Sequence, residues 1–272
     1  MKRRRFISLA GTGAIATFSI QSFSQIANRK SKWQPDGVGS LARIGLLTPD
    51  FDPVPESEMY AMTPQGVSIH TSRVILDHGP LSFAEPPNVD NATELLTGLN
   101  PRVILYGFTS SSYLLGVEED EHLRTRLEKR SHGIPVILTC QAATEAFRVL
   151  GAHNVALIHP PWFSDEVNRK AKDYFMGLGF EVGFCAKMTP SRTFTEVTPA
   201  EVYKWVKTNI PRETDAIFIG GNGLRAVGAI SSLEQNLRKP VLTANQVLLW
   251  AALRLIGANS QVTNYGTVFT KS

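Results

Sequence analysis

The stretch PVILTCQ at residues 135–141 occurs again as PVLTANQ at residues 240–246, and this near-repeat is the strongest indication of the fold. Three more pairs of similar stretches accompany it in the same order along the chain: RIGLLTP (43–49) with NVALIHP (154–160), the apolar run before FTSS (108–111) with the run before GGNG (220–223), and FRVLGA (147–152) with LRLIGA (253–258). The partners are separated by 105 to 112 residues. Four pairs with nearly the same spacing predict a chain built from two similar halves.

Short apolar runs alternate with amphipathic stretches in both halves. We expect strands at the following runs: 43–49, 103–107, 135–138, 154–158, 216–219 and 240–243. Helices are expected from about 142 to 150, from about 165 to 177, and through Leu255. Continuous apolar strands that alternate with helices are typical of parallel sheets. The expected fold class is therefore α/β, with two pseudo-symmetric lobes that each hold a parallel sheet. The alternative is two generic α/β halves whose similarity is only compositional.

Parallel sheets place their ligand sites where the carboxyl ends of the strands meet. For two facing lobes that place is the cleft between them, so the ligand site is expected there. The expected organisation is an N-terminal signal segment, a linker and two lobes, with these bounds: segment 1–24, linker 25–41, lobe 1 at 42–152, lobe 2 at 153–244, and residues 245–272 packing back on lobe 1.

The first residues are typical of an export signal. Residues 3–7, RRRFI, match the twin-arginine pattern, and a mildly apolar run follows them. Residues 1–24 are therefore predicted to be a twin-arginine signal peptide, with the twin-arginine translocase as partner and the periplasm as destination. Residues 22–24, SFS, offer two small residues for cleavage but lack the usual Ala-x-Ala. An uncleaved membrane anchor and a chance basic start therefore stay open as alternatives.

The composition excludes several classes of protein. Lys2 and the three arginines after it supply four of the 28 basic residues, so the remaining 24 only balance the 24 acidic residues. A neutral body without a basic run argues against nucleic-acid binding. Two cysteines, Cys140 and Cys185, exclude a disulfide scaffold; one disulfide between them and two free thiols are both open. The six histidines show no metal-ligand spacing, so we expect neither a metal nor another cofactor.

Four turns follow the expected strands and should line the cleft: 48–52, 108–112, 159–163 and 220–223. In the second turn, Thr109, Ser110 and Ser111 present consecutive hydroxyls at a helix start. This pattern favours binding of a carboxylate or phosphate, and a simple helix cap is the alternative. The fourth turn, which includes Gly221 and Asn222, is rich in glycine. Glycine has no Cβ, so the backbone of this turn can approach a ligand closely. No lysine follows in a P-loop frame, and no dinucleotide fingerprint is complete.

Two titratable residues in these turns are candidates for proton transfer, His159 and Asp50. Residues of these types at strand ends more often make structural hydrogen bonds, which is the alternative for both. Cys140 stands at the start of an expected helix, where the helix dipole would lower the pKa of its thiol.

Taken together, the repeat and the turns resemble the aspartate/glutamate racemase superfamily, and within it the branch of arylmalonate decarboxylase and maleate cis-trans isomerase. The resemblance extends from about residue 42 to residue 270 and rests on the order and spacing of these stretches: 43–49, 107–116, 135–152, 165–168, 219–224 and 239–257. In the racemases of that superfamily, two cysteines act on opposite faces of the substrate carbon. The decarboxylase keeps one cysteine, which protonates an enediolate after carbon dioxide leaves.

The resemblance implies roles for individual positions of this chain. Thr109 and Ser110 match the pair that holds the substrate carboxylate, and Phe163 stands where a tyrosine is usual, which removes one hydrogen bond. Phe108 and Gly221 occupy the two cysteine positions, so both thiols are missing. Racemisation by two thiols and isomerisation by a thiolate nucleophile are therefore not expected.

The expected function is that of an exported superfamily member that acts on a small, partly apolar carboxylate such as a substituted malonate, by decarboxylase- or isomerase-like chemistry without the usual cysteine pair. Catalysis is favoured but left open. The alternative is a non-catalytic periplasmic protein that binds a carboxylate, and a homodimer is also left open. If the Thr109 hydroxyl binds the ligand, Thr109→Val should weaken carboxylate binding and leave the stability of the fold nearly unchanged.

Overall fold

The computed structural model describes residues 36–189, 196–258 and 262–271. The chain divides into two units, Met1–Asp36 and Gly37–Ser272, and nearly all described residues belong to the second. The predicted signal peptide, residues 1–24, lies outside the described residues, as does the predicted linker up to residue 35. In the described part of the chain, no helix is both long and apolar enough to cross a membrane.

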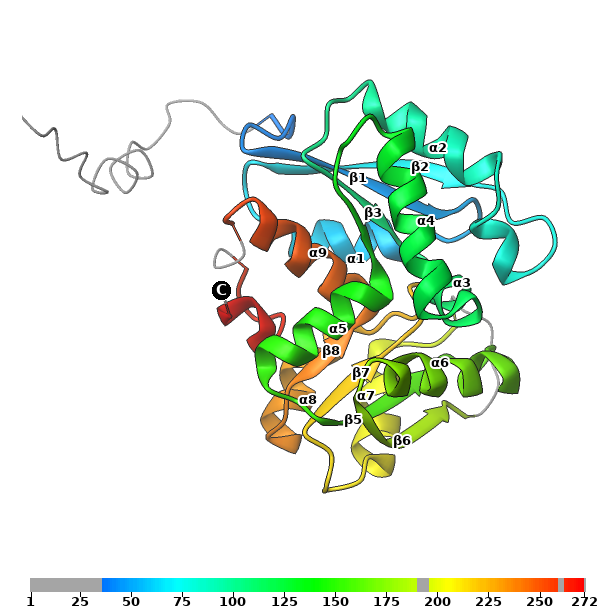
Figure 1. The fold of residues 1–272 in the computed structure, drawn as a ribbon. Helices are drawn as coiled ribbons and strands as arrows, with labels where there is room; N and C mark the ends of the chain where they lie inside the picture. The colour runs from blue at the N-terminus through cyan, green and yellow to red at the C-terminus, as the bar shows by residue number, and fades with distance from the viewer. Residues whose placement is uncertain (1–35, 190–195, 259–261, 272) are drawn as a thin grey trace, which may run out of the picture. The chain divides into compact units, whose positions relative to one another are not determined.

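Two four-stranded parallel sheets organise the second unit (Figure 1). The first sheet has the order β2-β1-β3-β4, with these strands: β1 Ala42–Pro49, β2 Val67–Val74, β3 Val103–Tyr106 and β4 Val136–Leu138. The second sheet has the order β6-β5-β7-β8, with these strands: β5 Asn154–His159, β6 Glu181–Lys187, β7 Ala216–Ile219 and β8 Val241–Thr243. Each sheet therefore runs second, first, third, fourth in its own half, which confirms the predicted two-lobed α/β fold.

The near-repeat that predicts the fold forms the end of each sheet and the helix that follows it. In both halves the chain passes directly from strand to helix, from β4 into α5 (Thr139–Leu150) and from β8 into α9 (Ala244–Leu255). The helix α5 thus begins three residues earlier than predicted, because the threonine and cysteine after β4 already adopt helical geometry. The two helices pack against each other, and α9 also packs against β3, β4 and the helix α1 (Val54–Met62).

The strands expected from continuous apolar runs include neither β2 nor β6, each of which lies at one edge of its sheet. β2 is absent from the prediction, since its sequence VSIHTSRV mixes polar and apolar residues and has no continuous apolar run. Half of the β2 residues are not buried, so this strand needs less apolar sequence than the central strands β1 and β3, whose described residues are nearly all buried. The remaining helices are α2 Asn88–Thr97, α3 Thr109–Leu115, α4 Val117–Arg130, α6 Asp165–Gly177, α7 Pro199–Asn209 and α8 Ile230–Leu237.

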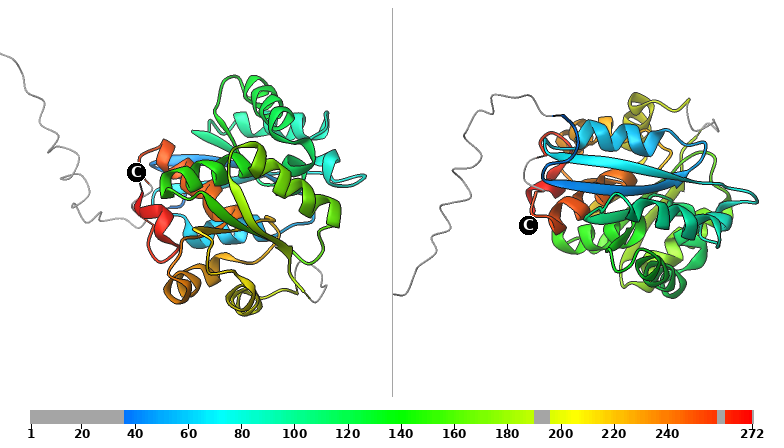
Figure 2. Two further views of the ribbon diagram at one scale, coloured as in Figure 1. Left: turned by 60° about the horizontal axis from the view of Figure 1, so that its bottom comes forward. Right: turned by 90° about the horizontal axis from the view of Figure 1, so that it is seen from above.

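The first sheet separates two hydrophobic cores. On one face, Ile44, Leu46 and Leu105 join a large core that includes α1, α5, α9 and the whole second sheet. On the other face, Leu47 and Ile104 pack against α2 and α4 in a smaller core. Figure 2 shows α1 and the pair of α2 and α4 on opposite sides of β1 and β2. The two sheets therefore share one continuous apolar interior, which holds the strand ends of both halves in fixed positions.

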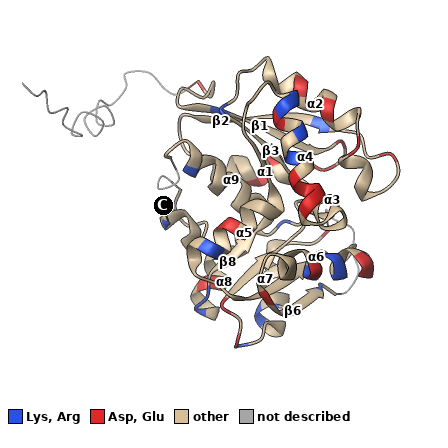
Figure 3. Ribbon diagram, viewed as in Figure 1, with Lys and Arg blue, Asp and Glu red and all other residues tan. Residues whose placement is uncertain are grey.

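Charged residues of both signs are interspersed along the ribbon (Figure 3). On α4, Arg126 and Arg130 pair with Asp90 and Glu94 of α2. The ion pairs lie between neighbouring helices, so they neutralise the surface locally, in line with the absence of a basic run in the sequence.

Candidate active site

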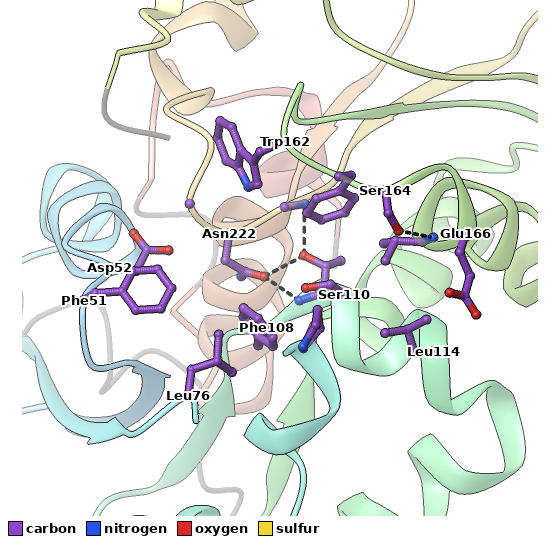
Figure 4. A pocket seen from close by; sticks show the side chains of 16 residues that line it. Phe51, Asp52, Leu76, Phe108, Ser110, Leu114, Trp162, Ser164, Glu166 and Asn222 are labelled. Carbon is purple, nitrogen blue, oxygen red and sulfur yellow. Dashed lines mark hydrogen bonds between the residues drawn. The ribbon is translucent and has the colours of Figure 1, made fainter. Parts of the chain in front are cut away.

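A pocket of about 380 Å³ opens where the carboxyl ends of central strands from both sheets meet (Figure 4). The turns after β1, β3, β5 and β7 supply most of its lining: Phe51, Asp52, Phe108, Thr109, Ser110, Trp162, Phe163, Gly221, Asn222 and Gly223. The segment after β2, the helix α3 and the start of α6 supply the rest: Leu76, Pro80, Leu114, Ser164, Glu166 and Val167. All four predicted turns therefore contribute, and neither half encloses the pocket alone.

The second and fourth turns are clamped together across the two halves. The backbone N–H and the hydroxyl of Thr109 both donate to Oδ1 of Asn222, at 2.9 and 2.7 Å. The same hydroxyl oxygen accepts the backbone N–H of Gly221 at 2.9 Å. The one hydroxyl proton of Thr109 is thus already used by the protein. This differs from the expectation that Thr109 donates to a ligand, because a residue from 113 positions further along the chain takes that proton.

A buried carboxylate fixes the orientation of this clamp. Glu58 on α1 accepts hydrogen bonds from the backbone N–H groups of Ala226 and Val227 and from Nδ2 of Asn245, at 2.7, 3.0 and 2.8 Å. Oδ1 of Asn245 then faces Nδ2 of Asn222, which leaves Oδ1 of Asn222 to accept from the second turn. Since backbone N–H groups stand at both ends of the chain of bonds, neither amide can flip without placing two donors face to face.

Ionisation of Glu58 is opposed by its surroundings. Burial raises the pKa of this carboxyl to about 7, although the hydrogen bonds from Asn245, Val227 and Ala226 act in the opposite direction. The negative charge of Asp52 nearby raises the pKa further. Sequence reasoning missed Glu58, and its only sequence signal is an acidic residue on the apolar side of an amphipathic helix.

The two serines of the second turn have different surroundings. Ser110 lines the pocket, and within the described residues its hydroxyl has no protein hydrogen-bond partner. Ser111 does not line the pocket; its hydroxyl bonds to the Tyr106 hydroxyl at 2.6 Å and to the Phe108 carbonyl oxygen at 3.1 Å. Of the predicted carboxylate-binding hydroxyls, the structure therefore leaves Ser110 available, while Ser111 stabilises the turn.

The carboxylate that the first turn brings into the pocket is Asp52 and not the predicted Asp50. Asp50 is exposed and does not line the pocket, whereas Asp52 is only 4% exposed and does. The tight turn that follows β1, closed by the Asp52 N–H donating to the Pro49 carbonyl oxygen, directs the two side chains differently. Burial raises the pKa of Asp52 to about 6, while a hydrogen bond from Val54 and the charge of Arg73 oppose this rise.

The predicted proton carrier His159 lies beneath the pocket and not in it. It is fully buried, its Nδ1 hydrogen-bonds with Oδ1 of Asn168 at 2.7 Å, and its ring stacks against Phe163. Burial lowers the pKa of His159 to about 4, so the ring is neutral near pH 7. Its other nitrogen, Nε2, has no partner among the described residues. His159 therefore packs behind Phe163 of the aromatic wall and does not itself line the pocket.

Neither cysteine reaches the pocket. Both are free thiols, so the disulfide that the sequence leaves open is not formed. Cys140 is fully buried, with its thiol 3.9 Å from the Thr109 carbonyl oxygen, and burial raises its pKa well above the ordinary value. The predicted lowering by the helix dipole is wrong, since desolvation outweighs it. Cys185 lies on β6, and burial raises its pKa to about 11.

Phe108 and Gly221, the residues at the two cysteine positions of the resemblance, both line the pocket. Phe108 packs against Phe83, with ring centroids 4.6 Å apart, and closes the floor of the pocket with an apolar surface. Gly221 has a φ of 88°, and a Cβ there would collide with the ring of Pro160. A side chain at this position is therefore excluded by both backbone conformation and space.

The pocket is mostly apolar. Its aromatic and aliphatic walls surround a few polar groups, and none of its described lining residues is lysine or arginine. In Figure 4, Asp52 and Glu166 lie on opposite sides of the pocket, with Asn222 between them. Among the residues 36–189, 196–258 and 262–271, no three His, Cys, Asp or Glu side chains gather in a way that could hold a metal ion.

Two parallel α/β halves with one pocket at their shared strand ends form the fold that this chain shares with solved structures of maleate isomerase and arylmalonate decarboxylase. More narrowly, the family model of arylmalonate decarboxylase matches residues 88–269, and the chain belongs to this family.

The individual relatives include maleate isomerases and arylmalonate decarboxylase. A maleate isomerase of Geobacillus stearothermophilus is 22% identical over 247 residues, which cover 84% of this chain and 97% of the relative. The crystal structure of a cysteine-to-alanine variant of the maleate isomerase Iso from Pseudomonas putida, with maleate, has a TM-score of 0.75 at 22% identity and covers 85% and 98% of the two chains. A crystal structure of arylmalonate decarboxylase has a TM-score of 0.69 at 22% identity, with 85% and 100% covered.

Proposed function

We propose that this chain is an exported, cofactor-independent decarboxylase that acts on a small malonate with one apolar substituent. The observation that supports this most is the composition of the pocket: apolar walls from both halves, one free serine hydroxyl and one buried carboxyl, without a thiol. A carboxylate that leaves as carbon dioxide needs to be desolvated, and apolar walls favour the neutral product over the anion. The other carboxylate stays bound and must be held by hydrogen-bond donors.

Ser110 is the donor best placed to hold the retained carboxylate. Its hydroxyl faces the pocket, and no described residue forms a hydrogen bond with it. Because the described lining contains no cation, binding depends on such neutral donors, each worth roughly 1.5–3 kcal/mol toward a charged group. The aromatic side chains of Phe108, Trp162 and Phe163 are suited to the apolar substituent.

Isomerisation of maleate is a weaker proposal for this chain. The maleate cis-trans isomerase of Nocardia farcinica, which is 21% identical to it, has been seen with a covalently bound succinylcysteine intermediate, in a mutant that carries serine in place of one cysteine. Here no described residue that lines the pocket is a cysteine, and Cys140 is fully buried. A thiolate adduct would require a different pocket.

The proposed activity is tested with the purified protein and a panel of phenylmalonate, methylmalonate, malonate and maleate. We expect release of carbon dioxide, fastest from phenylmalonate, with one solvent deuterium at the α-carbon of the product in D2O. Ser110→Ala serves as the matched variant and should raise KM. Stabilisation of the protein by these acids without release of carbon dioxide from any of them would instead support the alternative, a carboxylate-binding protein.

Export is tested separately from chemistry. The twin-arginine pattern at residues 3–7 supports delivery to the periplasm. Replacing Arg3 and Arg4 together by lysine should leave the protein in the cytoplasm, as measured by cell fractionation. Unchanged periplasmic delivery of this double variant would contradict the proposed route.

A further inference from the structure

We infer that Asp52 is the catalytic proton donor of this pocket: it delivers the proton that replaces the departing carboxylate on the substrate carbon. The inference rests on the proposed decarboxylase function and adds the group that completes the reaction. It stands on the position of one buried carboxyl in a pocket that has no thiol among its described lining residues.

The position of Asp52 is built by elements of both halves. One carboxyl oxygen, Oδ1, accepts the backbone N–H of Val54 at 3.0 Å, which holds the side chain at the start of α1. The other oxygen, Oδ2, lies against the fourth turn: a Cβ at Gly223 would stand 2.7 Å from it. Glycine at position 223 is therefore what leaves room for the carboxyl. One oxygen is anchored, and the other lies beside a turn that lines the pocket.

The charged groups around Asp52 favour a carboxyl that can hold a proton. Arg73 of β2 donates to the backbone carbonyl oxygen of Asp52 at 2.7 Å and is ion-paired with Glu56, so its charge is shared. Glu58 of α1 is a second buried acid that interacts with Asp52. With burial as the largest cause, the pKa of Asp52 lies at about 6, and the negative charge of a bound malonate would raise it further.

The other titratable groups near the pocket are poorer donors. Glu166 lines the pocket but is exposed at the first turn of α6, where water surrounds it. His159 and Cys140 are fully buried and do not line the pocket. Asp52 alone among these combines burial with a place in the lining.

The chemical step is balanced with solvent as the source of the proton. The bond between the α-carbon and one carboxylate of the malonate breaks, and its electron pair stays on the α-carbon and the retained carboxylate as an enediolate. Carbon dioxide leaves. A new C–H bond then forms with the proton of Asp52, whose carboxylate takes up a proton from water. The net reaction converts a substituted malonate dianion and one proton into a monocarboxylate and carbon dioxide.

The test compares Asp52→Asn with Asp50→Asn in the purified protein. The asparagine keeps the size of the side chain and an oxygen that can accept from Val54, but it cannot donate an acidic proton. We expect kcat for phenylmalonate to fall by about 100-fold or more, the effect typical of a lost general acid. KM should stay the same or fall, since one negative charge is removed. Asp50→Asn, which changes an exposed carboxyl of the same turn that does not line the pocket, should change kcat by less than about threefold.

The pH profile distinguishes a proton donor from a structural residue. The wild-type kcat/KM should fall as the pH rises above about 6, because the free enzyme must carry the proton. The residual rate of Asp52→Asn should lack this fall. If Asp52→Asn keeps the kcat and the pH profile of the wild type, the role of Asp52 is overturned while the proposed function stays intact.

A second readout separates the role of Asp52 from decarboxylation itself. The reverse proton transfer would exchange the α-protons of phenylacetate for deuterium in D2O. One outcome is that the wild type exchanges these protons and Asp52→Asn does not, while neither protein releases carbon dioxide from malonates. That result would support Asp52 as the proton carrier and refute the proposed function. Absence of both exchange and carbon dioxide release in the wild type would refute both.

Discussion

The two halves of the molecule share one sheet topology but contribute different chemistry to the pocket. Both halves supply apolar walls, but the buried carboxyl of Asp52 and the Ser110 hydroxyl come from the first half, and the glycine-rich turn comes from the second. The helices of the near-repeat differ as well: Cys140 is a buried thiol, and its counterpart Asn245 donates a hydrogen bond to Glu58 of the other half. The repeat gives both halves the same sheet topology, and the substitutions within it make the pocket asymmetric. An asymmetric pocket suits a substrate that loses one of its two carboxylates and keeps the other.

The largest expected effect concerns the glycine turn of the second half. Gly221→Ala should lower the free energy of unfolding by about 2–5 kcal/mol, because the left-handed conformation costs about 1–2 kcal/mol and the collision with Pro160 adds overpacking. Chemical denaturation measures the loss. Gly228→Ala is the control: Gly228 is exposed and its added Cβ would only touch Pro199 at 3.4 Å. Equal losses in both variants would contradict the argument.

A somewhat smaller effect is expected where the two halves are clamped. Thr109→Val leaves Asn222 Oδ1 with one donor fewer and strands the Gly221 N–H, so the free energy of unfolding should fall by about 2–3 kcal/mol. This reverses the expectation from sequence, in which the partner of the hydroxyl is the ligand. Thr208→Val, which removes an exposed hydroxyl on α7, should change stability by less than about 1 kcal/mol. If Thr109→Val matches this control, the hydroxyl is not a clamp.

The carboxyl that orients the clamp gives a pH-dependent prediction. Glu58→Gln should lose about 1–2 kcal/mol at pH 5, since an amide NH2 cannot accept from Asn245. The pKa of Glu58 is raised from 4.5 to about 7, so the folded protein binds more protons than the unfolded chain in that window. Wild-type stability from this group therefore falls as the pH rises from about 4.5 to 7.

Glu58→Gln lacks this decrease of stability with pH. The free energy of unfolding that it loses relative to the wild type should therefore shrink between pH 5 and pH 8. Denaturation curves of both proteins at the two pH values measure the change. Glu145→Gln, at a surface ion pair with Arg254, serves as the control and should show a small difference with little change over this range. A deficit of Glu58→Gln that grows with pH would show that the sign is wrong.

The smallest effect on stability is expected at Ser110. Ser110→Ala should leave the free energy of unfolding within about 0.5 kcal/mol of the wild type and weaken binding of phenylacetate about tenfold, as titration calorimetry would measure. Its neighbour should behave in the opposite way. Ser111→Ala removes a buried hydrogen bond to Tyr106 and should lose about 1 kcal/mol of stability with little change in affinity. Similar behaviour of the two serines would remove the assigned division of roles.

The sequence by itself determined the two-lobed α/β fold of this protein. Central strands such as β1 and β3 are buried on both faces, so their sequences are continuous apolar runs that can be recognised without a structure. The near-repeat then predicted two similar halves, and parallel topology implied that the turns after these strands line one pocket. The edge strand β2 was missed because a half-exposed strand carries no such run.

Only the tertiary structure decided which side chains face the pocket. Asp50 and Asp52 are equivalent in sequence terms, and a tight turn exposes the first and buries the second. Thr109 is bonded to a residue of the other half, and burial of Cys140 reverses the pKa shift expected from its helix position. Sequence patterns report the local periodicity of strands and helices. Partners more than 100 residues apart, and the desolvation that sets a pKa, depend on how the two halves pack together.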